Sequence, residues 1–200
     1  MPSNGQAVFA TPTSHAPDSP PDRLAPTANQ IGVTRAVAAV LLGIGFVIAV
    51  GDDAPTAASV LPAAAAAILT AYPVIDVIAS ILGAPSAGDG RRALYFNAAV
   101  SAVATAAIGV AAFGSDAGAT LVAFGSWAIV SGIIQFVLAL RDRRAKGGHL
   151  AMLISGGLSA LVGLSFVAAS RESDVNLGTL AAYMIVGAIL FIISARRRAV

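Results

Sequence analysis

The sequence predicts an all-α integral membrane protein whose six transmembrane helices form three repeated helical hairpins, with both termini on the cytoplasmic side. The first observation is composition: hydrophobic residues make up 57% of the 200-residue chain and charged residues only 11%, with a mean hydropathy of +0.83. A soluble globular domain carries about 25% charged residues. The other two observations are apolar runs long enough to cross a bilayer and a one-sided distribution of arginine.

The same composition excludes several functions. A net charge of +2 is too small to predict a positively charged surface that binds nucleic acid. The absence of cysteine excludes disulfides and thiol chemistry, and two histidines cannot form a zinc site without help from carboxylates. We therefore expect no cofactor, no metal and no nucleic-acid partner. The lipid bilayer is the expected partner, with a homo-oligomer or other membrane proteins as further candidates.

Residues 1–30 differ from the rest of the chain. They hold six of the ten prolines and few large apolar side chains. They therefore cannot bury enough surface to offset the entropy lost on folding. We interpret them as a disordered, proline-rich cytoplasmic tail. We do not expect them to be a secretory signal peptide, because they lack a charged start followed by an apolar stretch.

Six apolar runs of about 20 residues follow, each long enough to cross a hydrocarbon core about 30 Å thick. The first contains one charge, Arg35, and the second contains Asp76 and a helix-bending Pro73. Two arginines precede the third, a basic segment follows the fourth, and an acidic segment separates the fifth from the sixth. Segments such as 37–50 are apolar on every face, which favours helices over the alternating strands of a barrel. The predicted spans are 31–50, 58–82, 93–113, 117–140, 150–169 and 177–195.

These spans form one membrane domain over residues 31–198, with hairpins at about 31–83, 92–141 and 149–198. Eleven of the twelve cations precede the first span, lie at its entrance, or fall in the second connection, the fourth connection and the C-terminus. The odd connections carry five acids and only Arg171. Because cations in short loops are retained in the cytoplasm, both termini are predicted to face it. Eleven arginines against one lysine favour a bacterial source, and hence the bacterial inner membrane.

A repeat is visible in the first helices of the second and third hairpins. Three small residues of one match three small residues of the other at a constant offset of 54. The four-residue spacing places each set on one helix face, where small side chains allow a second helix to approach closely. The first hairpin follows loosely through Arg35, Ala39 and Gly43. The predicted packing residues are Gly43, Ser101, Thr105, Gly109, Ser155, Ser159 and Gly163.

Two segments resemble a known family. Residues 126–144, SWAIVSGIIQFVLALRDRR, and residues 153–163, LISGGLSALVG, are similar to the HdeD-like family of bacterial inner-membrane proteins. That family is built from a repeated two-helix membrane unit of unknown function and is named for an acid-resistance protein. The resemblance covers roughly residues 31–198. It implies a six-helix inner-membrane protein with a role in envelope or acid stress, and it carries over no catalytic residue.

Asp76 is the one acid inside a predicted span. An ionisable group at the centre of a membrane helix costs about 2.5–3.5 kcal/mol, so a partner is expected. Counting from the first turn places Arg35 about one turn from Asp76. We favour a structural ion pair over a proton or cation site. Asn97 and Gln135 fall in the same leaflet and complete a candidate polar cluster, although interhelical hydrogen bonding is the favoured interpretation for both.

Two functions compete. The first is a non-enzymatic multi-pass protein that contributes to envelope or acid-stress physiology. The alternative is a small proton-linked or cation-linked transporter or channel that uses Asp76. A membrane enzyme is disfavoured, because the sequence offers no activated nucleophile, metal cluster or pair of intramembrane carboxylates. A flux assay across a pH gradient separates the first two functions.

Overall fold

A computed structural model describes residues 28–51, 56–141, 149–172 and 177–198. These residues form six α-helices and two short 3₁₀ turns, η1 (Ala84–Ser86) and η2 (Gly88–Gly90). Most of the predicted tail and three loop segments lie outside the described residues. The six helices are α1 (Ala28–Val50), α2 (Ala63–Gly83), α3 (Arg91–Gly114), α4 (Ala117–Arg141), α5 (His149–Ala169) and α6 (Gly178–Arg198).

The observed helices fall close to the predicted spans, with two shifts. Helix α1 begins at Ala28, inside the segment that was predicted to be tail. Helix α2 begins at Ala63, so the predicted start at residue 58 was wrong. The reason is Pro62, whose backbone is extended, with ψ at 137°. Proline also keeps the residue before it out of the helical region, so the helix cannot extend backwards past this point.

Five of the described helices are long and apolar enough to cross a membrane, and they are α1 to α5. The sixth contains a shorter apolar stretch, Gly178–Ile193, where a full span had been predicted. Large apolar side chains are exposed along the helices, as expected where lipid replaces water. By the length and composition of its helices, the chain is a multi-pass helical membrane protein.

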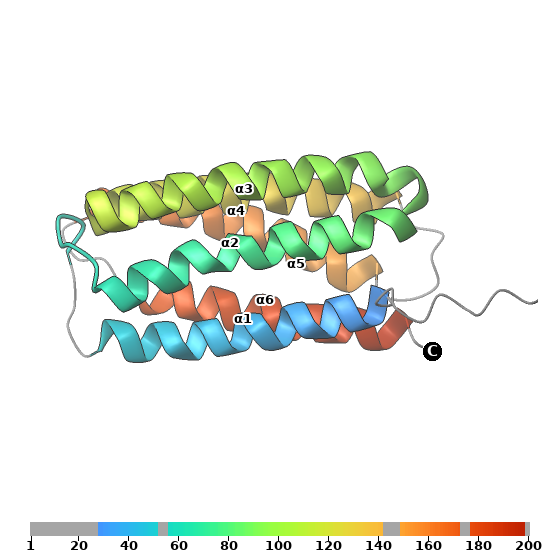
Figure 1. Ribbon diagram of the computed structural model, residues 1–200, viewed down its shortest axis with the longest axis horizontal. Helices are drawn as coiled ribbons and strands as arrows, with labels where there is room; N and C mark the ends of the chain where they lie inside the picture. The colour runs from blue at the N-terminus through green and yellow to red at the C-terminus, as the bar shows by residue number, and fades with distance from the viewer. Residues whose placement is uncertain (1–27, 52–55, 142–148, 173–176, 199–200) are drawn as a thin grey trace, which may run out of the picture.

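The helices lie side by side along the long axis of an elongated bundle (Figure 1). Each helix packs against its neighbours in the chain, and α1 packs against α6, so the six helices form a closed ring. The most extensive interfaces are α4 with α5, α2 with α3, and α1 with α6. All three join helices of different predicted hairpins. The three-hairpin repeat therefore stays a prediction, and the hairpins are not the units that pack most extensively.

Glycines spaced seven residues apart hold α4 and α5 together. A Cβ atom on Gly125 would lie 2.6 Å from the carbonyl oxygen of Gly163, and one on Gly132 would lie 2.7 Å from that of Gly156. A Cβ on Gly118 would lie 2.7 Å from the carbonyl oxygen of Ser170. Seven residues are about two helical turns, so these glycines form a continuous row along which two antiparallel backbones touch.

The two other predicted packing glycines, Gly43 and Gly109, make looser contacts than the glycine row. A Cβ on Gly43 would lie 3.1 Å from a side-chain carbon of Ile185 on α6, and one on Gly109 would lie 3.3 Å from the Thr70 methyl group on α2. Ser155 is buried, and the Cβ atom of Ser159 faces Gly132. Thr105 donates its hydroxyl to the Ser101 carbonyl of its own helix, at 2.8 Å.

The connection before α2 is fixed to the start of α4. The backbone N–H groups of Ala117 and Gly118 donate to the carbonyls of Ser59 and Ala57, at 2.9 and 2.8 Å. Asp116 caps the same helix by accepting the Ala119 N–H at 2.7 Å. This end of the bundle therefore fixes α4, which carries part of the polar cluster described below, relative to α2.

Substitution of Gly163 by alanine is expected to destabilise the protein far more than the same change at Gly109. The new methyl group at position 163 meets backbone atoms of α4 that cannot move independently, whereas at position 109 it meets the end of a threonine side chain. We expect a loss of about 1–3 kcal/mol for Gly163→Ala. Thermal unfolding in detergent measures it, with Gly114→Ala as control because its Cβ would have no neighbour within 4 Å. Equal unfolding temperatures for Gly163→Ala and the control would contradict the close packing of α4 and α5.

Candidate functional site

Asp76 lies inside the bundle, on the face of α2 that meets α1 and α3. Its side chain is only 2% exposed, and the turns of α2 on either side of it are predominantly apolar. A carboxylate in such a place must have its charge and its lone pairs satisfied by other helices, because neither lipid nor water can do so. The site is therefore defined by the groups that approach the two carboxylate oxygens.

Arg35 of α1 forms an ion pair with one of these oxygens, through Nη2 and Asp76 Oδ1. The guanidinium carbon also lies 4.0 Å from the ring centroid of Phe191 on α6, within the range of a cation–π contact. The Arg35 side chain is 23% exposed. The charge of Asp76 is thus neutralised by a cation that the α6 ring holds in place.

The second oxygen, Oδ2, accepts two short hydrogen bonds from α3. Asn97 Nδ2 donates at 2.7 Å and Ser101 Oγ donates at 2.6 Å. Asn97 Nδ2 also donates to Ser80 Oγ on α2, at 2.9 Å. Hydrogen bonds to a charged acceptor are roughly twice as strong as those between neutral groups. These contacts fix α3 to α2 at the level of Asp76.

Helix α4 supplies Ser131 to the same cluster. Its hydroxyl lies 3.1 Å from Asn97 Oδ1 and 3.4 Å from Asp76 Oδ2. One hydroxyl has a single proton to donate, and the shorter distance assigns it to Asn97. Asn97 consequently bonds through both ends of its amide, which gives the amide one orientation.

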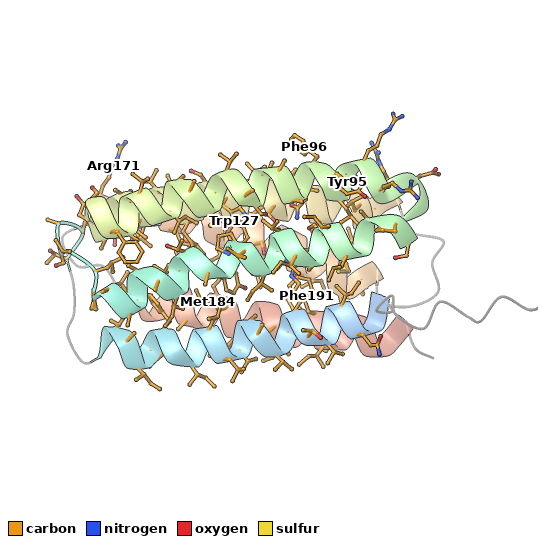
Figure 2. The ribbon with its side chains drawn as sticks, viewed as in Figure 1. Tyr95, Phe96, Trp127, Arg171, Met184 and Phe191 are labelled. Carbon is orange, nitrogen blue, oxygen red and sulfur yellow. The ribbon has the colours of Figure 1, made fainter. Side chains whose placement is uncertain are left out.

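Trp127 of α4 determines the direction of the Ser101 hydroxyl. Its Nε1–H donates to Ser101 Oγ at 2.9 Å. An indole N–H can only donate, so the serine oxygen accepts from Trp127 and its own proton is directed to Asp76. Trp127 is itself held edge-to-face by Tyr72 and Phe124, with ring centroids 5.7 and 5.3 Å away. Figure 2 shows Trp127 among the helices in the interior of the bundle.

The two carboxylate oxygens are therefore satisfied in different ways. Among the buried side-chain nitrogen and oxygen atoms that the structure describes, Asp76 Oδ1 is the one without a hydrogen-bond partner. It nevertheless forms an ion pair with Arg35 Nη2. We regard Oδ1 as satisfied by charge, because Coulomb attraction needs proximity rather than alignment.

Three of the four predicted cluster residues come together: Arg35, Asp76 and Asn97. Gln135 does not join them, and its Nε2 donates to Met152 Sδ on α5 at 3.7 Å. The reason is its position three residues after Gly132, on the face of α4 that packs against α5. Both amides make the interhelical contacts favoured from the sequence, but with different helices.

The sequence also held a signal for the cluster members that were not predicted. Asp76 and Ser80, Asn97 and Ser101, and Trp127 and Ser131 are each four residues apart on otherwise apolar helices. Residues four apart share a helix face, so each pair presents two polar groups to the same neighbour. Ser80, Trp127 and Ser131 could have been added to the predicted cluster on that spacing alone. Ser101 had been predicted, but as a packing residue.

Removing one member of the ion pair is expected to destabilise the protein more than removing both. Arg35→Gln leaves a 2% exposed carboxylate without its countercharge, whereas Asp76→Asn leaves a guanidinium that is 23% exposed. We expect Arg35→Gln to cost about 3–5 kcal/mol and Asp76→Asn less, with part of the loss recovered in the double variant. Unfolding in detergent measures all three. Additive losses would show that the two charges do not act as a pair.

Comparisons with protein-family models, with curated proteins and with solved structures found no match to this chain. The resemblance to the HdeD-like family therefore depends on the two segments quoted above, and any role that it implies is a proposal.

Proposed function

We propose that this chain is a non-enzymatic multi-pass protein of the bacterial inner membrane, in which all six helices cross the bilayer and both termini face the cytoplasm. Helix α6 contains 21 residues, which span about 31 Å and match a hydrocarbon core of about 30 Å. It lies alongside α1 over the length of the bundle (Figure 1). These two features support α6 as a sixth span despite its shorter apolar stretch.

The charges at the two ends of the bundle support the orientation. The start of α3 carries Arg91 and Arg92, and α4 ends at Arg141. The opposite end carries Asp116 and Glu172 together with Arg171, which Figure 2 shows at that end, far from Tyr95 near the start of α3. The cation-rich end is the one that the positive-inside rule places in the cytoplasm.

The observation that carries the proposed function is the engagement of Asp76. One oxygen faces Arg35, and the other accepts hydrogen bonds from Asn97 and Ser101. The carboxylate thus connects α1, α2 and α3 directly, and Ser131 and Trp127 extend the same network to α4. A group held by this many fixed partners suits a structural role better than repeated binding and release of a solute.

The biological role that fits such a protein is in envelope or acid-stress physiology. The support is the resemblance of residues 126–144 and 153–163 to the HdeD-like family. A stress role requires that the bundle stay folded in the membrane when conditions outside the cell change. A buried ion pair surrounded by donors and aromatic rings is an interaction that water outside the membrane reaches poorly.

A second candidate function is proton-linked or cation-linked transport through Asp76. One observation favours it: Oδ1 has no hydrogen-bond partner, and among the described residues the cation that faces it is the partly exposed Arg35. A cation that displaced Arg35 would find this oxygen without a competing donor. Intramembrane acids are functional often enough for this candidate to merit a direct test.

The orientation can be tested with two matched cysteine variants of a chain that contains no cysteine. Ser86 and Ser115 are both exposed and lie at opposite ends of the bundle. We expect Ser115→Cys to react in intact cells with an impermeant thiol reagent, and Ser86→Cys to react only after the membrane is opened. The reverse pattern would invert the orientation, and labelling of both in intact cells would contradict the six-span topology.

The role of Asp76 can be tested in cells that lack the chain and then express variants of it. If the role is structural, Asp76→Asn lowers survival at acid pH, and adding Arg35→Gln restores part of it in step with the recovered stability. If Asp76 carries protons or cations, Asp76→Asn abolishes survival and the second change restores nothing. Proteoliposomes provide the direct measurement: the structural role predicts no flux that distinguishes the wild type from Asp76→Asn across a pH gradient.

A further inference from the structure

The ring of helices has a groove between α5 and α6. A cavity of about 320 Å³ lies there and is lined by residues of these two helices alone. The other side of α5 is closed against α4 by the glycine row, where backbone atoms touch. Helix α5 is thus packed closely against α4 and less closely against α6.

The groove is long and narrow. Its lining residues run from Ser155 to Phe166 on α5 and from Thr179 to Leu190 on α6. At 1.5 Å per residue, each side is about 17 Å long. Half of a hydrocarbon core about 30 Å thick is about 15 Å, which is the depth occupied by the acyl chains of one leaflet. The groove therefore has the length of one acyl chain.

The groove is continuous with the surface that the helices turn to the bilayer. Its rims, Leu158 and Val186, are 37% and 42% exposed. Next to them on the lipid-facing surface, Leu161 and Ile189 are 67% and 49% exposed and lie outside the lining. The lining contains no aspartate, glutamate, lysine or arginine. An occupant can enter sideways from the bilayer, and it need carry no charge.

Three of the polar side chains that line the groove are engaged with other protein groups. Tyr183 donates its hydroxyl to Ser159 Oγ at 3.1 Å, across the gap between the two helices. Ser165 donates to the Val162 carbonyl of its own helix at 2.7 Å. Phe166 is buried against Tyr183 and Phe124. A hydrocarbon chain along the apolar part of this lining would supply the dispersion contacts that an empty apolar space lacks.

We propose that one acyl chain of a membrane phospholipid occupies this groove and forms part of the wall between α5 and α6. A phospholipid is the occupant we propose, because the groove opens to the bilayer and has the length of one leaflet. This occupancy is independent of the role of Asp76, since none of the lining residues belongs to the Asp76 cluster.

The experiment uses the full chain in vesicles that contain a phospholipid with a photoactivatable diazirine in its acyl chain. After irradiation, the positions of attachment are mapped by mass spectrometry. We expect attachment at Ser159 and Tyr183, which lie within the groove, to exceed attachment at Leu161 and Ile189, which face lipid outside it. Lipids that merely surround the bundle would give the opposite order, in proportion to exposure, and would overturn the proposal.

Two matched variants sharpen the test. Ala182 lines the groove and is exposed, so Ala182→Leu fills the groove without entering the packed core. We expect it to lower attachment within the groove severalfold. Ala106→Leu makes the same change at an exposed position on α3 and should leave attachment unchanged. Unfolding in detergent verifies that both variants fold. Equal attachment in both folded variants would contradict the proposal.

Native mass spectrometry separates a phospholipid from the other occupants. We expect the wild type to retain one phospholipid and Ala182→Leu to lose it. A dimer that Ala182→Leu dissociates would show that a second copy fills the groove. A wild-type chain that retains neither would show an empty groove. Either of the last two results overturns the proposal.

Discussion

The ion pair between Arg35 and Asp76 is the interaction on which the arrangement of the first four helices depends. Hydrocarbon offers a carboxylate neither hydration nor countercharge, so helices that place one inside the bundle must bring its partners with them. Arg35 links α1 to Asp76 through the ion pair, and Asn97 and Ser101 link α3 to it through hydrogen bonds. The hydrogen bond from Trp127 to Ser101 links α4 to the same cluster. Each of these contacts has one geometry. Because the buried charge is stable only when all of these contacts are made, it fixes the positions of four helices relative to one another.

A different kind of contact joins the rest of the bundle. Apolar side chains in lipid gain little by meeting one another, because the lipid tails that they leave are equally apolar. Helices α4 and α5 associate instead through backbone contact, which the glycine row from Gly118 to Gly132 permits over two heptads. Helix α4 thus takes part in both interactions. Its serine and tryptophan face the polar cluster, and its glycines face α5.

The sequence predicts the helices well and their packing poorly. Length and hydropathy placed the helices within a few residues, and the missed start of α2 follows from the local effect of Pro62. Arg35 and Asp76 could be paired because short turns make consecutive helices antiparallel, so their levels follow from counting residues. Rotation about each helix axis does not follow from counting, because lipid and neighbouring helices select similar apolar residues. That is why Gln135 was grouped with Asp76 although it faces α5, and why the glycine row that orients α4 was not recognised as an interface.

The groove between α5 and α6 follows from the same physical rule that closes the other interfaces. In water, the hydrophobic effect would favour closing an apolar gap of this size. In a bilayer that driving force is absent, and two helices remain apart unless small residues or polar groups draw them together. The hydrogen bond from Tyr183 to Ser159 joins α5 and α6 near the middle of the groove. Above and below it no glycine of one helix meets a backbone atom of the other among the described residues. The molecules that surround this protein in the bilayer are lipids with long acyl chains. A narrow gap between two helices that lie side by side therefore has the right shape to hold an acyl chain.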